Sequence, residues 1–398
     1  IDIDSDLKNN HALYGHMSNL CITDSAQTYH PDDIELNILA HADTTDIDVV
    51  CGDFKLCANA NEGYSSLMEV YGIISEDINR QWTERTIDES NLRRKLPTAT
   101  LYMKTGHENP LARFMSYIGY GFSSAYIDMK TSPVAGINGT LSVDTLNTNG
   151  ILLDKISANL ISDTDKISYD ISIANGQDNP QYSFAALLKG EVINDGTTCT
   201  LTIDDKNGMR GIDIGISAVV ETEHIGLKFH DRPQILGYKE FMPNKNNAIR
   251  IGKGMRLSSD VMLVADDGVG FRLYTNDANV DALQDLTLSV YKLDLASIFS
   301  ILPYTPNVKG VLNGDFHAIV DKESTSISSN IDVSNLSYEN SPIGNISTEI
   351  VYMPHSDGSH YVDGIIYKED KEIATLSGTY VFGKEDYIDA KLMLKDMP

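Results

Sequence analysis

The sequence predicts an all-β protein, an elongated antiparallel meander with a few short amphipathic helices. Apolar and polar residues alternate as in half-buried strands, most clearly over 211–220. Such segments recur about every 12 to 17 residues, which leaves no room for the crossover helices that parallel strands need. Clusters of Asp, Asn and Gly between the segments, as at 194–196, favour tight turns and complete the pattern of a meander.

The chain opens with Ile1 and Ile3 alternating with Asp2 and Asp4, which predicts an N-terminal strand. Later alternating segments predict strands over 167–173, 199–203, 212–220, 312–320, 327–331, 346–352 and 388–394. Their inward-facing apolar residues are Ile167, Ile171, Leu201, Ile212, Ile214, Ile216, Val220, Ile331, Ile350 and Leu392. The alternation shows which residues share a face of each strand, and it leaves open what covers that face.

Helical signals occur in a few short segments. In the first segment, apolar residues keep the spacing of an amphipathic helix opposite a polar face that includes Asp77. The second has an N-cap at Asp88, and the third has an N-cap at Asn109 followed by a first-turn proline. The helices are predicted over 64–82, 88–95, 110–119 and 295–302.

A short internal correspondence predicts the domain organisation. The third helix is followed by a proline and two nearby glycines at 136–139, and the fourth by the same pattern at 310–314, each interpreted as a turn before a strand. We therefore expect an N-terminal β segment with two helices over 1–108, a helix-plus-meander module over 109–292 and a second such module over 293–398.

Composition and charge limit the classes of partner. The 398 residues are 41% hydrophobic and 22% charged, as in an ordinary soluble globular protein. Lys and Arg number 31 against 57 Asp and Glu, and the net charge of −26 repels phosphate backbones, so we expect no nucleic-acid partner. The sequence has no starting Met, no leader and no apolar stretch of about 20 residues. We expect a segment of a longer protein or a mature form.

Motifs of catalytic and metal centres are absent from the sequence. It contains no nucleophile elbow, no zinc-protease helix and no phosphate-binding loop, so we expect no enzyme activity, no cofactor and no metal. His355 and His360 flank a turn that contains Asp357, and we expect a solvated hairpin tip there. Cys51 and Cys57 would pair only if a turn lay between them, and the sequence leaves this open.

The apolar face continues through many strands, and the helices are too few to cover it. Such a face is matched by a second sheet, by closure of the sheet on itself, or by an apolar ligand held in a groove. Periodicity does not separate these three solutions.

Short motifs over most of the chain point to one family. In the C-terminal part they are Gly310, Gly314-Asp315, Ser337-Tyr338, Ile343-Gly344, the run from Glu349 to Tyr352, Leu376-Ser377-Gly378 and the final Leu394-Lys395-Asp396-Met397-Pro398. Earlier ones are Gly52-Asp53-Phe54, the runs from Leu92 to Pro97 and from Gly106 to Pro110, Leu153-Asp154-Lys155-Ile156 and Leu283-Gln284-Asp285-Leu286. With these motifs the chain resembles a middle fragment of the translocation and assembly module family, TamB, which is related to AsmA-like and bridge-like lipid-transfer proteins.

The resemblance implies a periplasmic bridge, anchored in the inner membrane by a segment missing here, that reaches an outer-membrane barrel protein of the assembly family. It implies an open, apolar-lined β half-pipe (β-taco) that carries phospholipid and supports outer-membrane biogenesis. The ten inward-facing residues would then line a lipid trough, and no catalytic residue carries over. Asp315, His317 and Lys391 interrupt or flank apolar runs, and any of them pointing inward would break the trough.

Two other functions compete with lipid transport. One is a chaperone-like scaffold for outer-membrane proteins, which would hold nascent strands by β-augmentation. The other is a surface adhesin or glycan-binding β solenoid with a dry core, against which the single Trp argues because glycan sites favour aromatic platforms.

Overall fold

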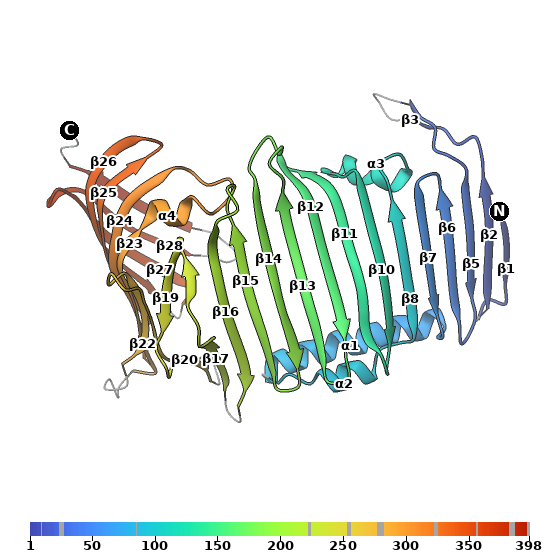
Figure 1. The fold of residues 1–398 in the computed structure, drawn as a ribbon, viewed down its shortest axis with the longest axis horizontal. Helices are drawn as coiled ribbons and strands as arrows, with labels where there is room; N and C mark the ends of the chain where they lie inside the picture. The colour runs from blue at the N-terminus through green and yellow to red at the C-terminus, as the bar shows by residue number, and fades with distance from the viewer. Residues whose placement is uncertain are drawn as a thin grey trace. The chain divides into compact units, whose positions relative to one another are not determined.

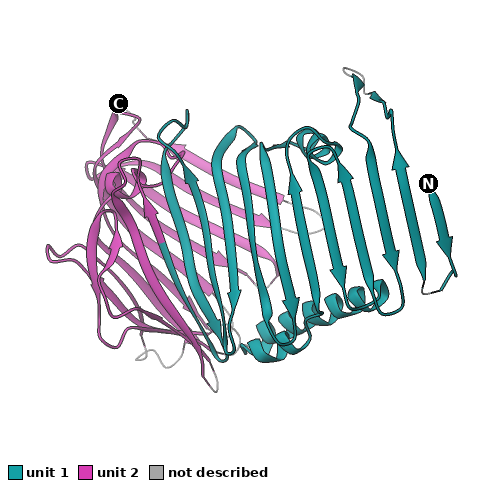
Figure 2. Ribbon diagram, turned by 45° about the vertical axis from the view of Figure 1, so that its right-hand side comes forward, with its two compact units in different colours: residues 1–201 teal, residues 202–398 magenta. Residues whose placement is uncertain are grey.

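The computed structural model describes residues 1–8, 10–23, 28–84, 86–221, 224–252, 256–276, 282–321, 325–355, 357–381 and 387–395. The chain divides into two compact units, Ile1–Leu201 and Thr202–Pro398 (Figure 2). The boundary between the units falls inside the module expected over 109–292. The division into three parts remains a prediction.

The first unit is an antiparallel meander in which strands pair with their neighbours (Figure 1). Its strands are β1 (Asp2–Ser5), β2 (His11–Met17), β5 (Ile34–Ala40), β6 (Thr45–Cys51), β7 (Phe54–Ala60), β8 (Ala99–Thr105), β10 (Ser124–Ser132), β11 (Gly136–Thr148), β12 (Ile151–Ser162), β13 (Lys166–Asn175) and β14 (Phe184–Ile193). The short β9 (Tyr120–Gly121) pairs with β11, and β3 (Ile22–Thr23) pairs with β4 (Thr28–Tyr29). Strand β15 (Gly196–Asp204) crosses the boundary between the units.

The second unit is also antiparallel. Its strands are β16 (Arg210–Val220), β17 (Ile225–Phe229), β18 (Gln234–Leu236), β19 (Lys239–Pro243), β20 (Ala248–Ile251), β21 (Leu257–Val264), β22 (Gly270–Thr275), β23 (Gln284–Asp294), β24 (Val308–Val320), β25 (Thr325–Tyr338), β26 (Ser341–Pro354), β27 (Ser359–Lys368), β28 (Lys371–Val381) and β29 (Tyr387–Leu394). Strand β16 pairs with β17 and β18, and from β21 onward each strand pairs with the next. The predicted all-β class, an antiparallel meander with few helices, is confirmed.

The predicted helices are present as α1 (Tyr64–Glu84), α2 (Glu89–Arg94), α3 (Pro110–Tyr117) and α4 (Leu295–Phe299). The predicted caps are formed, because the Asp88 side chain accepts a hydrogen bond from the amide of Asn91 and Asn109 accepts one from Ala112. Helix α4 is shorter than predicted and ends where the amide of Ser300 bonds back into its last turn. Within the described residues no helix is both long and apolar enough to span a membrane.

The two glycine patterns interpreted as turns lie instead inside β11 and β24, so that prediction is wrong. Gly310 sits at a shift in strand register with φ of +146°, and a Cβ at Gly139 would lie 2.5 Å from the carbonyl oxygen of Asp128. These glycines serve a bulge and a close backbone approach rather than turns. The surroundings also differ, since β9 and β10 separate α3 from β11 whereas β24 follows α4 directly.

Candidate functional site

One face of the first unit's sheet is apolar across its strands. The strand register makes Ile47, Ala58, Leu101 and Met129 successive cross-strand partners on β6, β7, β8 and β10. Because side chains alternate along a strand, residues two positions away share this face. The face continues through Leu141 and its partner Ala158 on β11 and β12.

The predicted trough residues of the first unit lie on this same face. Ile171 pairs with Ala158, and Ile167 lies four residues earlier on the same strand. Leu201 is half-buried in β15. No trough residue is predicted within the first 130 residues, although Ile34, Leu36 and Ile38 alternate with polar residues there and belong to the same face.

In the second unit, seven predicted residues share a single face of the sheet. Consecutive cross-strand pairs connect Ile212, Ile214, Ile216 and Val220 on β16 with Ile331, Ile350 and Leu392 on the later strands. Ile212 is only 8% exposed, because its partner Leu236 packs against the buried cluster around Phe241. It therefore belongs to the packed interior, and little of its side chain is open to a ligand in this structure.

In the first unit, most of the apolar face is not covered by a second layer, and Ile171 keeps 39% of its surface exposed. In the second unit the same face includes Val261 and Val290, which are only 5% and 6% exposed, and it is exposed at Leu392 on β29, where every residue is exposed. Among the described residues of the first unit, only Cys51, Ala60, Ala112 and Phe184 are buried hydrophobic residues. A closed sandwich of this size would bury many more, so the sheet presents an apolar surface to its surroundings.

The charged residues that would have broken the trough lie on the opposite face. Asp315 accepts a hydrogen bond from Ser289, and Nε2 of His317 lies 2.7 Å from Oδ1 of Asp285. Lys391 pairs with Ser377 and alternates with Leu392. None of the three points into the apolar face.

Helix α1 crosses the strand ends of the first unit (Figure 1). It starts directly after β7, and the segment beyond its end reaches the β14–β15 turn, where Asp195 N donates to Ile87 O at 2.9 Å. Its 21 residues span about 31 Å, which matches the about 29 Å across the six spacings from β7 to β14. The helix therefore lies perpendicular to the strands and borders the sheet.

The inward side of α1 is mixed and not purely apolar. Leu67, Val70 and Ile74 are half-buried there. Asp77 and Gln81, on its polar side, are buried, while Tyr71 and Trp82 are 73% and 84% exposed. The carboxylate of Asp77 accepts hydrogen bonds from Arg80, from Lys95 at 2.8 Å and from Asn91 at 2.7 Å. The hydrogen bonds from Lys95 and Arg80 lower the pKa of Asp77.

A cavity of about 450 Å³ lies between α1 and the apolar face. Ile47, Ala58, Leu101 and Met129 form its sheet wall, and Tyr64 and Met68 are among the residues that α1 contributes. No residue around this cavity carries a charge. Its chemistry suits an apolar ligand.

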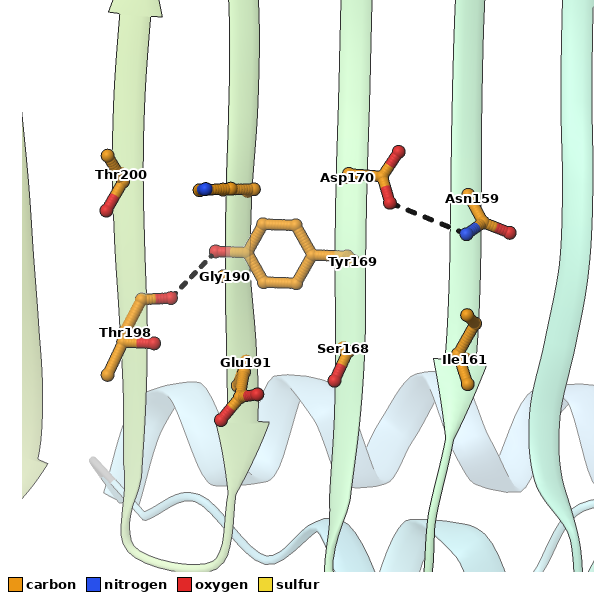
Figure 3. A pocket seen from close by; sticks show the side chains of 10 residues that line it. Asn159, Ile161, Ser168, Tyr169, Asp170, Gly190, Glu191, Thr198 and Thr200 are labelled. Carbon is orange, nitrogen blue, oxygen red and sulfur yellow. Dashed lines mark hydrogen bonds between the residues drawn. The ribbon is translucent and has the colours of Figure 1, made fainter. Parts of the chain in front are cut away.

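The first unit has a second, polar depression of about 350 Å³ on β12–β15 (Figure 3). Tyr169 extends across Gly190 and donates to the carbonyl of Thr198 at 3.2 Å, while Asn159 donates to Asp170 at 3.4 Å. Tyr169 and Asn159 are thus hydrogen-bonded within the sheet. The depression also carries the charges of Asp170, Lys189 and Glu191.

The cysteines and histidines singled out in the sequence have structural surroundings. Gly52 supplies a turn with φ of +57°, but Cys51 faces the apolar side and Cys57 the opposite side, and both are free thiols. Burial raises the pKa of the Cys51 thiol. The expected hairpin tip is present between β26 and β27, where His355 and Asp357 are exposed. His360 lies in β27 and stacks on Tyr380 with ring centroids 4.5 Å apart.

Comparison of the chain with protein-family models, curated proteins and solved structures finds no match. The function is therefore argued from the geometry.

Proposed function

We propose that the apolar faces of the two units bind the acyl chains of phospholipids. The chain would be a periplasmic segment of a bridge that carries lipid from the inner to the outer membrane, as the resemblance to TamB implies. An inner-membrane anchor and an outer-membrane barrel partner are parts of the same proposal. Its main support is the apolar face itself, which continues from strand to strand and remains partly exposed.

The physics of acyl chains fits such a face. Moving a chain from a bilayer into water costs about 0.8 kcal/mol per CH₂, or about 12 kcal/mol for 15 CH₂ groups. A sheet that covers one side of the chain recovers about half of this. Headgroups need no contact with the protein, because they remain hydrated along the uncovered side.

The charge distribution supports the same use. Cross-strand partners on the opposite face of the first unit include Asp48, Asp128 and Asp170, and the whole chain carries a net charge of −26. Repulsion between copies keeps a protein with an uncovered apolar face soluble and opposes its lying flat on an anionic bilayer.

The test places charge on the apolar face. In the double variant Ile214→Asp and Ile216→Asp, both changes fall on half-buried residues of the apolar face of β16, and each carboxylate there must be desolvated by a bound chain. Ser217→Asp on the opposite face of the same strand is the matched control. Native mass spectrometry and crosslinking to a diazirine-bearing phosphatidylethanolamine measure lipid occupancy, and thermal melting measures folding.

We expect the double variant to lose at least about tenfold in lipid occupancy while keeping its melting transition, and the control to keep both. Unfolding of the double variant, with no lipid found on the parent protein, would point to a dry closed core and an adhesin-like solenoid. Capture of an unfolded outer-membrane protein in place of lipid would support the chaperone.

A further inference from the structure

We propose that the cavity beneath α1 holds a single acyl chain that lies parallel to the helix and across the strands. This inference rests on the proposed function and assigns a defined site and orientation within it. The cavity is bounded by uncharged residues of four consecutive strands and of the N-terminal half of α1.

The dimensions of the cavity fit one chain. Half of the hydrocarbon core of a bilayer is about 15 Å thick, which is the depth that one acyl chain spans. The row Ile47, Ala58, Leu101 and Met129 covers three strand spacings, or about 14 Å. A chain along this row would contact the cavity over its whole length.

Small side chains make the space available. Thr45, Ala60, Ala99 and Thr131 form a second row of cross-strand partners beside the first. Ala58 lies in the first row, so the sheet wall is shallow directly under the tyrosine and methionine side chains of α1. Larger residues at these positions would fill the cavity.

The polar groups at the cavity favour an acyl chain over a peptide as the bound ligand. The Thr45 hydroxyl donates to the carbonyl of Glu62 at 3.0 Å, and the Thr131 hydroxyl donates to the carbonyl of Pro97 at 2.8 Å. Both hydroxyl protons are therefore already used, so the backbone carbonyls of a bound peptide would find no donor in these two groups and would lose their hydration without compensation. An acyl chain has no such groups to satisfy.

A second copy of the protein is a poorer occupant. The net charge of −26 opposes close approach of two chains. A segment of the same chain would also meet the backbone penalty described for a peptide. The proposal therefore commits to the acyl chain, carried either by a free fatty acid or by a phospholipid.

The experiment maps where a bound chain lies in the wild-type protein. Palmitic acid with a diazirine at carbon 6 or at carbon 16 is crosslinked and the labelled residues are identified by mass spectrometry, and the same two chains are then supplied within phosphatidylcholine. We expect the two diazirine positions to label different strands of the row, such as β7 and β10. Labelling by both carriers supports recognition of the chain itself, and labelling by palmitic acid alone supports a fatty-acid site.

The variant Ala58→Phe fills the cavity, and Ala185→Phe makes the same change on the polar face of the same unit at an exposed position. We expect cavity labelling to fall at least fivefold in Ala58→Phe. In the control Ala185→Phe, cavity labelling should stay unchanged. If the two diazirine positions label two residues of the same strand, for example Ala58 and Phe54 of β7, the acyl chain lies along the strand and the proposed orientation is overturned. Labelling of the apolar faces that spares the cavity would overturn this site and leave the proposed function standing, whereas absence of lipid everywhere would overturn both.

Discussion

Replacing Ile171 by Ala tests whether the apolar face is open in solution. The side chain is 39% exposed, so folding removes only about three fifths of it from water. Full burial of an isoleucine is worth about 1.5 to 3 kcal/mol, which gives a loss of about 1 to 2 kcal/mol in the free energy of unfolding. The same substitution in a closed core costs about 2 to 5 kcal/mol, because a cavity remains.

Urea unfolding of the variant, followed by circular dichroism, measures this loss. Phe184→Ala is the buried reference in the same unit, since Phe184 is 7% exposed, and it should cost about 3 to 5 kcal/mol. Thr140→Ala, at an exposed position on the polar face, should change stability by less than about 0.5 kcal/mol.

Lipid binding supplies the second half of the same prediction. If an acyl chain covers the remaining two fifths of Ile171, the variant loses a further 0.6 to 1.2 kcal/mol of binding, which is about threefold to eightfold in affinity. A stability loss close to that of Phe184→Ala would refute the open face. An unchanged lipid affinity would refute contact between the chain and this residue.

Three further outcomes are expected. Because the pKa of Asp77 is lowered by its hydrogen bonds, its ionised form stabilises the attachment of α1 above the ordinary value of 3.8. The hydrogen-exchange protection factors of α1 amides, which are corrected for the pH dependence of intrinsic exchange, should therefore fall as the pH drops below that value; protection factors that do not change with pH there would contradict this. Gly190→Val places a Cβ 1.9 Å from the carbonyl oxygen of Thr198 and should cost about 1 to 3 kcal/mol or more, and a neutral result in urea unfolding would show that the strands separate freely. A maleimide should modify exposed Cys21 rapidly and buried Cys51 slowly, and equal rates would mean that β6 opens readily.

The strands were predictable because alternation is a local property. The pattern over 211–220 matches β16, and the terminal alternation of Ile388 to Leu394 matches β29. The N-caps at Asp88 and Asn109 are equally local and are formed as predicted. The strand register is not visible in the sequence. The cross-strand pairs show that the apolar faces of the individual strands form one continuous face within each unit.

The cavity beneath α1 was not predictable, since it depends on contacts far apart in the sequence. The amphipathic pattern of α1 suggests burial of its apolar residues alone, but the partners of Asp77 come from the following helix and loop and hold this carboxylate inward beside half-buried Leu67 and Ile74. The small residues on β7 and β8 carry no distinctive pattern by themselves. Burial of Ile212 was missed for the same reason, because Leu236 belongs to a later hairpin.

The polar attachment of α1 has a consequence for how tightly the protein can hold a ligand. A helix that docked through its apolar side would collapse onto the sheet when empty, and a ligand would first have to separate the two. Here Asp77, Gln81 and their hydrogen-bond partners, which do not touch the cavity, help to hold α1 in place without a ligand. The binding free energy is then not spent on reshaping the site. Under the proposed function, such a site would accept and release successive acyl chains without rearrangement.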